Sequence, residues 1–81
     1  MIEKIKEIIE DITGEKVDEN TDLIEEGFLD SFDIVSLVLE LNDAFGIKIE
    51  VAELLPENFS NINDIEKLVK SLQWALPAFL L

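Results

Sequence analysis

The sequence predicts an all-α protein, a small four-helix bundle with three main helices and one short helix. Three observations support this prediction. Apolar residues recur every three or four positions along three segments. Glycines or capping residues stand at the ends of these segments. The one segment that alternates like a strand, residues 47–51, is short and has no second strand to pair with. The 81 residues suffice for one domain.

The first helix is predicted over residues 2–12, and Gly14 is placed to end it. Its apolar stripe consists of Ile2, Ile5, Ile8, Ile9 and Ile12. The connection from Glu15 to Asp30 exceeds the usual loop length, which indicates a functional or internally packed segment. We expect its apolar side chains to pack against the core: Val17, Leu23, Ile24, Phe28 and Leu29.

The second helix is predicted from Ser31 to Phe45, with Asp30 as its N-cap and Gly46 just after its end. Apolar residues cover a wide face of this helix, so we expect it to lie at the centre of the bundle. They are Phe32, Ile34, Val35, Leu37, Val38, Leu39, Leu41 and Phe45. A short helical turn is predicted over residues 52–55, ending before Pro56.

The last helix is predicted to begin after Asn61, which is a good N-cap residue. Asp64 stands three residues later, where its side chain can reach back and complete a capping box. The buried stripe of this helix is expected to be Ile62, Ile65, Leu68, Val69 and Leu72.

The sequence divides into a domain over residues 1–73 and an apolar tail over residues 74–81. The tail is uncharged, Pro77 is expected to interrupt any helix there, and eight residues are too few to span a membrane. Three alternatives remain open for the tail. It is an artificial extension, it packs on its own core or on another copy of the chain, or it is a docking peptide for a partner or a lipid. The expected state is a monomer, with tail-mediated self-association as the alternative.

The charge of the chain narrows the function classes. Nineteen acidic residues stand against six lysines, and the formal net charge is −13. Nucleic acid is therefore not an expected partner, because phosphate binding requires clustered basic residues. The chain also lacks histidine and cysteine, which removes the commonest general base and transition-metal ligands. A calcium loop starting at Asp18 fails as well, because Leu23 and Leu29 occupy the positions that require glycine and glutamate. No metal site is predicted.

The segment from Glu26 to Phe32 carries the most functional information. Gly27 permits a turn, and Asp30 caps the helix that follows. Ser31 then presents a hydroxyl group in the first helical turn, where free backbone N–H groups and the helix dipole favour a phosphate. From local chemistry alone, a role of Ser31 only in capping the helix is the favoured interpretation. A hydrolase based on Ser31 is disfavoured because the chain has no histidine to activate the hydroxyl.

The chain resembles the acyl carrier protein family over residues 2–72. The resemblance rests on Leu29-Asp30-Ser31-Phe32, which is similar to the family's aspartate–serine pair at the start of its second helix. The preceding acid-rich loop and the run from Phe59 to Ile65, which resembles the opening of the family's last helix, extend the match. Apolar residues also fall where the family keeps its apolar face: Val35, Leu37, Val38, Leu41, Phe45 and Ile49.

This resemblance implies a carrier and not an enzyme. A phosphopantetheinyl transferase is expected to attach 4′-phosphopantetheine to Ser31, beside Asp30 of the motif. The thiol of this arm then holds an acyl or aminoacyl group as a thioester. Further expected partners are an activating ligase and downstream enzymes with basic docking surfaces, acting in fatty acid, polyketide or nonribosomal peptide biosynthesis or in D-alanylation. The Asp-Ser-Phe form and the Gly46-Ile47 helix exit look most like D-alanyl carriers and stand-alone assembly-line carriers.

The resemblance also implies a docking stripe along the second helix, with partner-binding residues Asp33, Ser36, Glu40, Asp43 and, beyond the helix, Glu53. Ser36 stands where many bacterial fatty-acid carriers have a glutamate. An ordinary solvated face is the alternative for this stripe. For the whole chain, the alternative function is an unmodified acidic helical module that binds a basic protein. The N-terminus lacks the basic start and apolar run of a secretory signal, so a cytoplasmic location is predicted.

Overall fold

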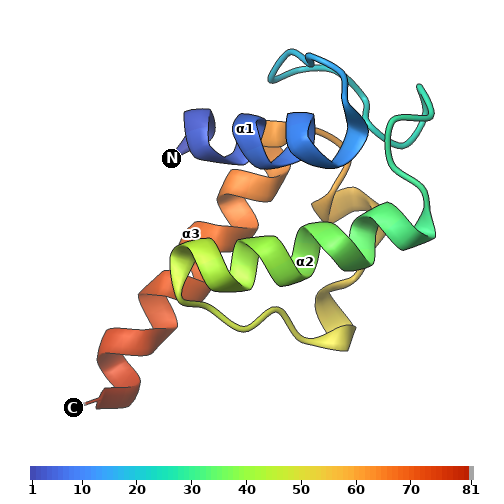
Figure 1. Cartoon of the computed structure of the whole chain (residues 1–81). Helices are drawn as coiled ribbons and strands as arrows, with labels where there is room; N and C mark the ends of the chain where they lie inside the picture. The colour runs from blue at the N-terminus through green and yellow to red at the C-terminus, as the bar shows by residue number, and fades with distance from the viewer. Residues whose placement is uncertain (81) are drawn as a thin grey trace.

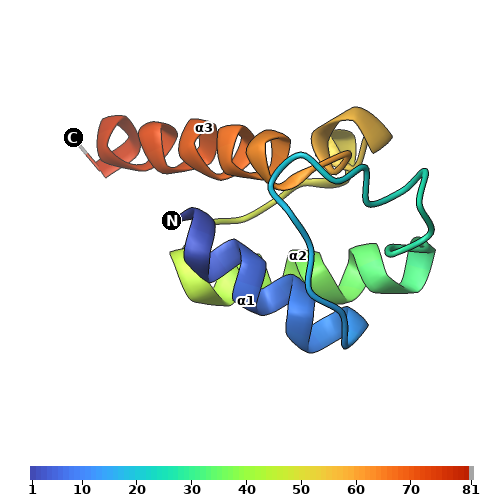
Figure 2. The same ribbon diagram turned by 90° about the horizontal axis from the view of Figure 1, so that it is seen from above.

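The computed structural model describes the backbone of residues 1–80 and the side chains of residues 1–73. Three α-helices account for most of it: α1 (Ile2–Thr13), α2 (Ser31–Phe45) and α3 (Ile62–Leu80). Two short 3₁₀ turns, η1 (Val51–Glu53) and η2 (Pro56–Asn58), lie between α2 and α3. Figure 1 shows α1 and α2 running in roughly opposite directions, and Figure 2 shows α3 covering this pair from the other side. The predicted all-α class is therefore confirmed.

The ends of the helices follow the capping chemistry of the sequence. α1 ends at Gly14, whose φ of 73° is left-handed and whose N–H donates to the carbonyl of Glu10. α2 ends in the same way at Gly46, with φ of 63° and an N–H bond to the carbonyl of Asn42. At the start of α3, the Oδ1 of Asn61 accepts the N–H of Asp64 at 2.9 Å, as expected of an N-cap.

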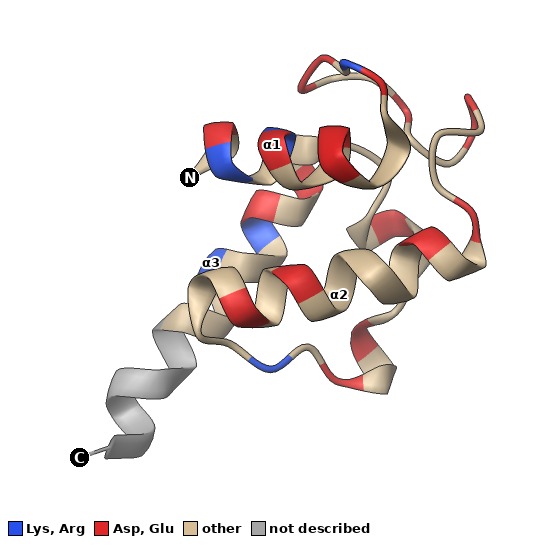
Figure 3. Ribbon diagram, viewed as in Figure 1, with Lys and Arg blue, Asp and Glu red and all other residues tan. Residues whose placement is uncertain are grey.

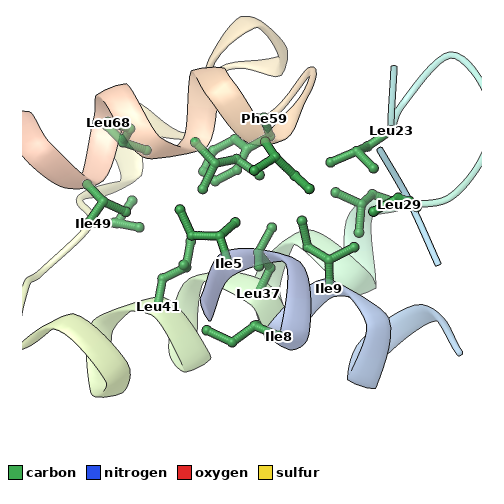
Figure 4. Packing of buried hydrophobic residues seen from close by; sticks show 14 of the residues in the cluster. Ile5, Ile8, Ile9, Leu23, Leu29, Leu37, Leu41, Ile49, Phe59 and Leu68 are labelled. Carbon is green, nitrogen blue, oxygen red and sulfur yellow. The ribbon is translucent and has the colours of Figure 1, made fainter. Parts of the chain in front are cut away.

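The hydrophobic core lies between the three helices, and the loop before α2 closes one end of it (Figure 4). All side chains that are buried among residues 1–73 are apolar. The loop contributes Val17, Leu23 and Leu29 to this core, while Ile24 and Phe28 pack against its edge, as predicted. The buried set also holds Ile5, Ile8, Ile9, Leu37, Leu41, Ile47, Ile49, Phe59, Ile62, Ile65, Leu68 and Val69.

The predicted central position of α2 is wrong. Only Leu37 and Leu41 of this helix are buried, and Ile34, Val38 and Phe45 pack at the edge of the core. The other three predicted core residues are exposed: Phe32, Val35 and Leu39. The central helix is α1, which packs against α2 and against α3 more extensively than those two helices pack against each other. In so small a bundle the neighbours of α2 cover only one of its sides, so apolar residues on the opposite side remain in contact with solvent.

The short fourth helix is present only as a 3₁₀ turn. The sequence predicts one helical turn near residues 52–55 that ends before Pro56, and η1 forms such a turn at Val51–Glu53, while η2 was not predicted. Pro56 separates them because its ring excludes a helical conformation at the preceding residue, and it then occupies the first position of η2. The segment is thus too short and too interrupted for an α-helix.

The last helix is longer than expected. α3 continues to Leu80, through Pro77, where the sequence predicted an interruption. Proline removes one i→i−4 hydrogen bond, and the helical backbone continues beyond it. The predicted packing of the tail concerns side chains that lie outside the described residues. Within the described part of the chain, none of the helices combines the length and the apolar composition required to cross a bilayer.

The burial pattern of α2 generates a matched test of this fold. Leu41 is fully buried, whereas Leu39 on the same helix is 65% exposed. Leu41→Ala should lower the free energy of unfolding by about 2–5 kcal/mol because it leaves a cavity in the core. Leu39→Ala should change it by less than about 0.5 kcal/mol. Urea denaturation of both variants measures the difference, and equal losses would contradict the orientation of α2.

Candidate functional site

The loop that leads into α2 is held by the backbone of Leu23. The N–H of Leu23 donates to the carbonyl of Ser60 at 2.7 Å, which joins the loop to the segment before α3. The carbonyl of Leu23 accepts the N–H groups of Phe28 and Leu29, both at 2.9 Å. The Leu23 side chain is fully buried. These contacts fix the chain immediately before Asp30 and so determine where α2 begins.

A tight turn between Leu23 and Leu29 brings the chain back toward the helix. Oδ1 of Asp22 accepts the N–H of Glu25, and the carbonyl of Asp22 accepts that of Glu26. Gly27 has φ of 78°, a left-handed conformation that a residue with a side chain adopts only with strain. This glycine lets Leu29 return to the core two residues later, and Leu29 is only 4% exposed.

Asp30 and Asp33 form a reciprocal capping box at the start of α2. Oδ1 of Asp30 accepts the N–H of Asp33 at 2.9 Å, and Oδ2 of Asp33 accepts the N–H of Asp30 at 3.2 Å. The sequence predicted the cap at Asp30 and assigned Asp33 to partner binding. The structure gives the Asp33 carboxylate a role inside the chain as well. The box fixes the first turn of α2 in a single conformation.

Ser31 is the first residue of α2 and is exposed. The first N–H groups of a helix have no acceptor within the helix. Among these groups, the N–H of Asp33 donates to the Asp30 carboxylate. The N–H groups of Ser31 and Phe32 have no acceptor within the helix. These donors and the positive end of the helix dipole favour a phosphate attached to the Ser31 oxygen. Because Ser31 is exposed, a phosphodiester attached there would not bury its charge.

The solvent side of α2 has an apolar half and a polar half. With about 100° of rotation per residue, positions 32, 35, 36, 39 and 43 project away from Leu37 and Leu41, and position 40 lies at the edge of this set. We call this set the outward face of α2. Its apolar residues are Phe32, Val35 and Leu39, which are 83%, 56% and 65% exposed. Its polar residues are Ser36, Glu40 and Asp43, which are all exposed.

The structure brings three of the five predicted partner-binding residues together on this face: Ser36, Glu40 and Asp43. Asp33 lies at its edge and is half-buried. Glu53 lies apart in η1, where its carboxylate accepts the N–H of Glu50 at 2.9 Å and its carbonyl accepts Nδ2 of Asn58 at 2.8 Å. The apolar half of this face was not predicted from the sequence. Its signal was present in the spacing of Phe32, Val35 and Leu39, which had all been assigned to the core.

The charges around this site have one sign. Between Lys16 and Lys48 the sequence has nine acidic residues and no basic one. Figure 3 shows acidic residues and no basic ones on α2, whereas lysines lie on α1, on α3, at the start of the loop before α2 and on the segment after α2. A partner with a positive surface is therefore attracted to the part of the molecule that contains Ser31.

Residues 3–69 match a protein family described as "Phosphopantetheine attachment site". The chain belongs to this family. As a member of the phosphopantetheine attachment family, it is a carrier protein and not an enzyme, and its prosthetic group is 4′-phosphopantetheine. Its function is to bear acyl or aminoacyl groups linked to that arm. The exposed serine and the free N–H groups at the start of α2 fit such a group.

Similar proteins include several D-alanyl carrier proteins. D-alanyl carrier protein 2 of Lactiplantibacillus plantarum is 41% identical over 68 residues, which cover 82% of this chain and 85% of the relative. The D-alanyl carrier protein of Lactococcus lactis subsp. cremoris is 38% identical over 73 residues, covering 86% and 92%. That of Streptococcus uberis is 37% identical over 65 residues, covering 80% and 78%. Carriers of this kind interact with transferases and ligases.

The capping box predicts a difference between two substitutions that remove the same charge. Asp30→Ala should destabilise the protein by about 1 kcal/mol, because the N–H of Asp33 loses its acceptor. Asp30→Asn should lower the stability by only a few tenths of this amount, because the amide oxygen of asparagine still accepts the N–H of Asp33. Thermal and urea unfolding compare the two. Equal destabilisation would show that the charge of Asp30, and not its cap, stabilises α2.

Proposed function

We propose that Ser31 is the residue that carries the phosphopantetheine arm, and that the cargo on this arm is D-alanine. The observation that carries the first part is the exposure of Ser31 in the first turn of α2, inside the matched segment and next to the Asp30 cap. The motif Leu29-Asp30-Ser31-Phe32 supports it. The names of the similar proteins support the second part.

In the attachment step, the Ser31 oxygen attacks the pyrophosphate of coenzyme A at the phosphorus nearer to pantetheine. A new oxygen–phosphorus bond forms, and 3′,5′-ADP leaves with the electrons of the broken bond. The hydroxyl proton passes to a base of the transferase, because this chain has no histidine. The arm, once attached, supplies a thiol that the chain itself lacks, and this thiol forms the thioester. Ser31 and the helix end only hold and orient it.

Partner enzymes are proposed to dock on the outward face of α2. The acidic residues Glu40 and Asp43 attract basic docking surfaces, as expected from the family resemblance. The structure adds three exposed apolar residues beside them, and burial of their side chains against a partner would contribute to affinity. Ser36 takes the place of a carboxylate on this face, so electrostatic attraction is weaker than in carriers with a glutamate there. We further propose that residues 1–73 form the carrier domain and that residues 74–81 lie outside it.

The assignment of Ser31 is tested by mass spectrometry of the intact protein. Incubation with coenzyme A and a broad-specificity phosphopantetheinyl transferase should add one phosphopantetheine group to the wild type and none to Ser31→Ala. Ser71→Ala is the control, because Ser71 is an exposed serine outside the outward face of α2. It should be modified fully. Modification of Ser31→Ala would refute the site, and an unmodified wild type would favour the acidic interaction module.

The cargo is tested on the protein that carries the arm. A D-alanine-activating ligase with ATP should load it to near completion, and hydroxylamine should release the D-alanine because the bond is a thioester. Loading by a fatty-acyl ligase should be slower by on the order of tenfold or more. Ser31→Ala, which cannot hold the arm, controls for direct acylation of the chain. Faster loading with a fatty acid would contradict a D-alanyl carrier and leave the carrier function intact.

A further inference from the structure

The C-terminal segment differs in charge from the rest of the chain. Residues 67–81 contain two lysines and no acidic residue, whereas all nineteen acidic residues precede them. From Ser71 to Leu81 there is no charged side chain at all, and most of these residues are apolar. The family match ends at residue 69, so the segment lies largely outside the part shared with other carriers.

The outward face of α2 is apolar like the C-terminal segment, but its rim is acidic, whereas the segment has only basic charges. Phe32, Val35 and Leu39 form its exposed apolar half, and Glu40 and Asp43 lie beside them. A ligand for this face must be apolar and must not bring further negative charge. Within this chain, the segment from Lys67 to Leu81 meets both conditions. Lys67 and Lys70 are exposed, and Lys70 contacts Glu66 at 3.7 Å in a pair that water screens.

Within one molecule, residues 67–81 do not lie near the outward face of α2. Figure 4 places Leu68 of α3 near Ile49, on the opposite side of the core from Leu29, which precedes α2. The described part of α3 therefore runs toward the C-terminal end of α2. Phe32 and Leu39 lie earlier on α2, and Phe32 is about 20 Å from Phe45 along the helix. The helical backbone of α3 covers only about 12 Å in its last eight residues.

We propose that residues 67–81 of one copy bind the outward face of α2 of a second copy. Leu68 and Val69 are buried in their own core, so the apolar residues that follow them in the segment cover Phe32, Val35 and Leu39. The two exposed lysines of the segment face the acidic rim. The contact joins unlike surfaces, so it forms reciprocal pairs or longer assemblies. Because only three exposed apolar side chains of the face are covered, we expect a weak, transient interface. It requires neither the arm nor Ser31, so it stands or falls independently of the proposed function.

The test uses the full, unmodified chain at increasing concentration. Sedimentation velocity should show the average mass rising from that of a monomer at about 10 μM toward at least that of a dimer near 1 mM, as a weak interface requires. Trp74 is the single tryptophan of the chain and lies in the segment. Its emission should shift to shorter wavelength over the same range of concentration. Ser31→Ala should behave like the wild type.

Two double variants test the two surfaces. Phe32→Ser with Leu39→Ser removes exposed apolar groups from the face, and Ala44→Ser is its control at an exposed position of α2 outside the face. Leu76→Ser with Phe79→Ser does the same to the segment, with Ala75→Ser and Ala78→Ser as its control. Each double variant should weaken association at least tenfold, and the controls should not. Circular dichroism checks that all variants keep the helical content of the wild type.

Four outcomes would overturn the proposal. A monomer at every concentration excludes the contact. Association that survives the face variant places the segment elsewhere. A face-dependent shift of Trp74 emission that is independent of concentration means that the segment folds onto its own molecule. A shift that occurs only after the addition of phosphatidylcholine vesicles identifies a lipid surface as the ligand instead.

Discussion

The backbone of Leu23 is the point on which the geometry of this protein depends. Its N–H group holds the loop to Ser60, and its carbonyl group holds the return of the chain through Phe28 and Leu29. If these partners were lost, the buried N–H and C=O groups of Leu23 would have neither a protein partner nor water to bond with. The resulting loss of stability would exceed the net contribution of the hydrogen bonds themselves. The loop is therefore a packed element in spite of its length. Through it, the segment before α3 and the first turn of α2 are held in one arrangement.

This arrangement explains why an irregular loop can precede a well-defined site. Leu23 and Leu29 are both buried, and the turn between them is exposed. The acidic residues of the turn are solvated, so they add charge to this region without a cost of burial. The capping box of Asp30 and Asp33 then completes the transition from loop to helix. The buried side chains fix the position of the site. The solvated acidic side chains around it attract positively charged partners over longer distances.

Local chemistry made much of the fold predictable. Glycine at positions 14 and 46 and aspartate at position 30 act within one turn of the chain, so the ends of α1 and α2 were read correctly from the sequence. The burial of the loop residues followed from their apolar character. The neighbouring helices determine which side of α2 is buried. Because apolar residues cover a wide face of α2, their spacing does not indicate how many helices pack against it. Phe32, Val35 and Leu39 were misplaced for this reason.

The candidate site was predictable in part for the same reason. Ser31 was identified from adjacent residues and from its motif, and its exposure agrees with that identification. The bond between the Asp33 carboxylate and the N–H of Asp30 was not predicted, nor was the bond between the Asn42 side chain and the N–H of Ile49, at 3.0 Å. The second bond joins residues seven positions apart and fastens the chain after α2 to that helix. Such contacts depend on the path of the backbone, which the sequence pattern does not specify.

The position of Ser31 inside the first turn, and not in the loop before it, has a mechanical consequence. A group attached there has a stiff base, because the helix and its capping box restrict the backbone on both sides of the serine. All of the reach and swing of an attached arm must then come from bonds of the arm itself. The volume that its end explores is a region of fixed centre relative to α2. An enzyme that binds α2 therefore also positions the base of the arm relative to its own active site. It does not need to contact the rest of the carrier for this.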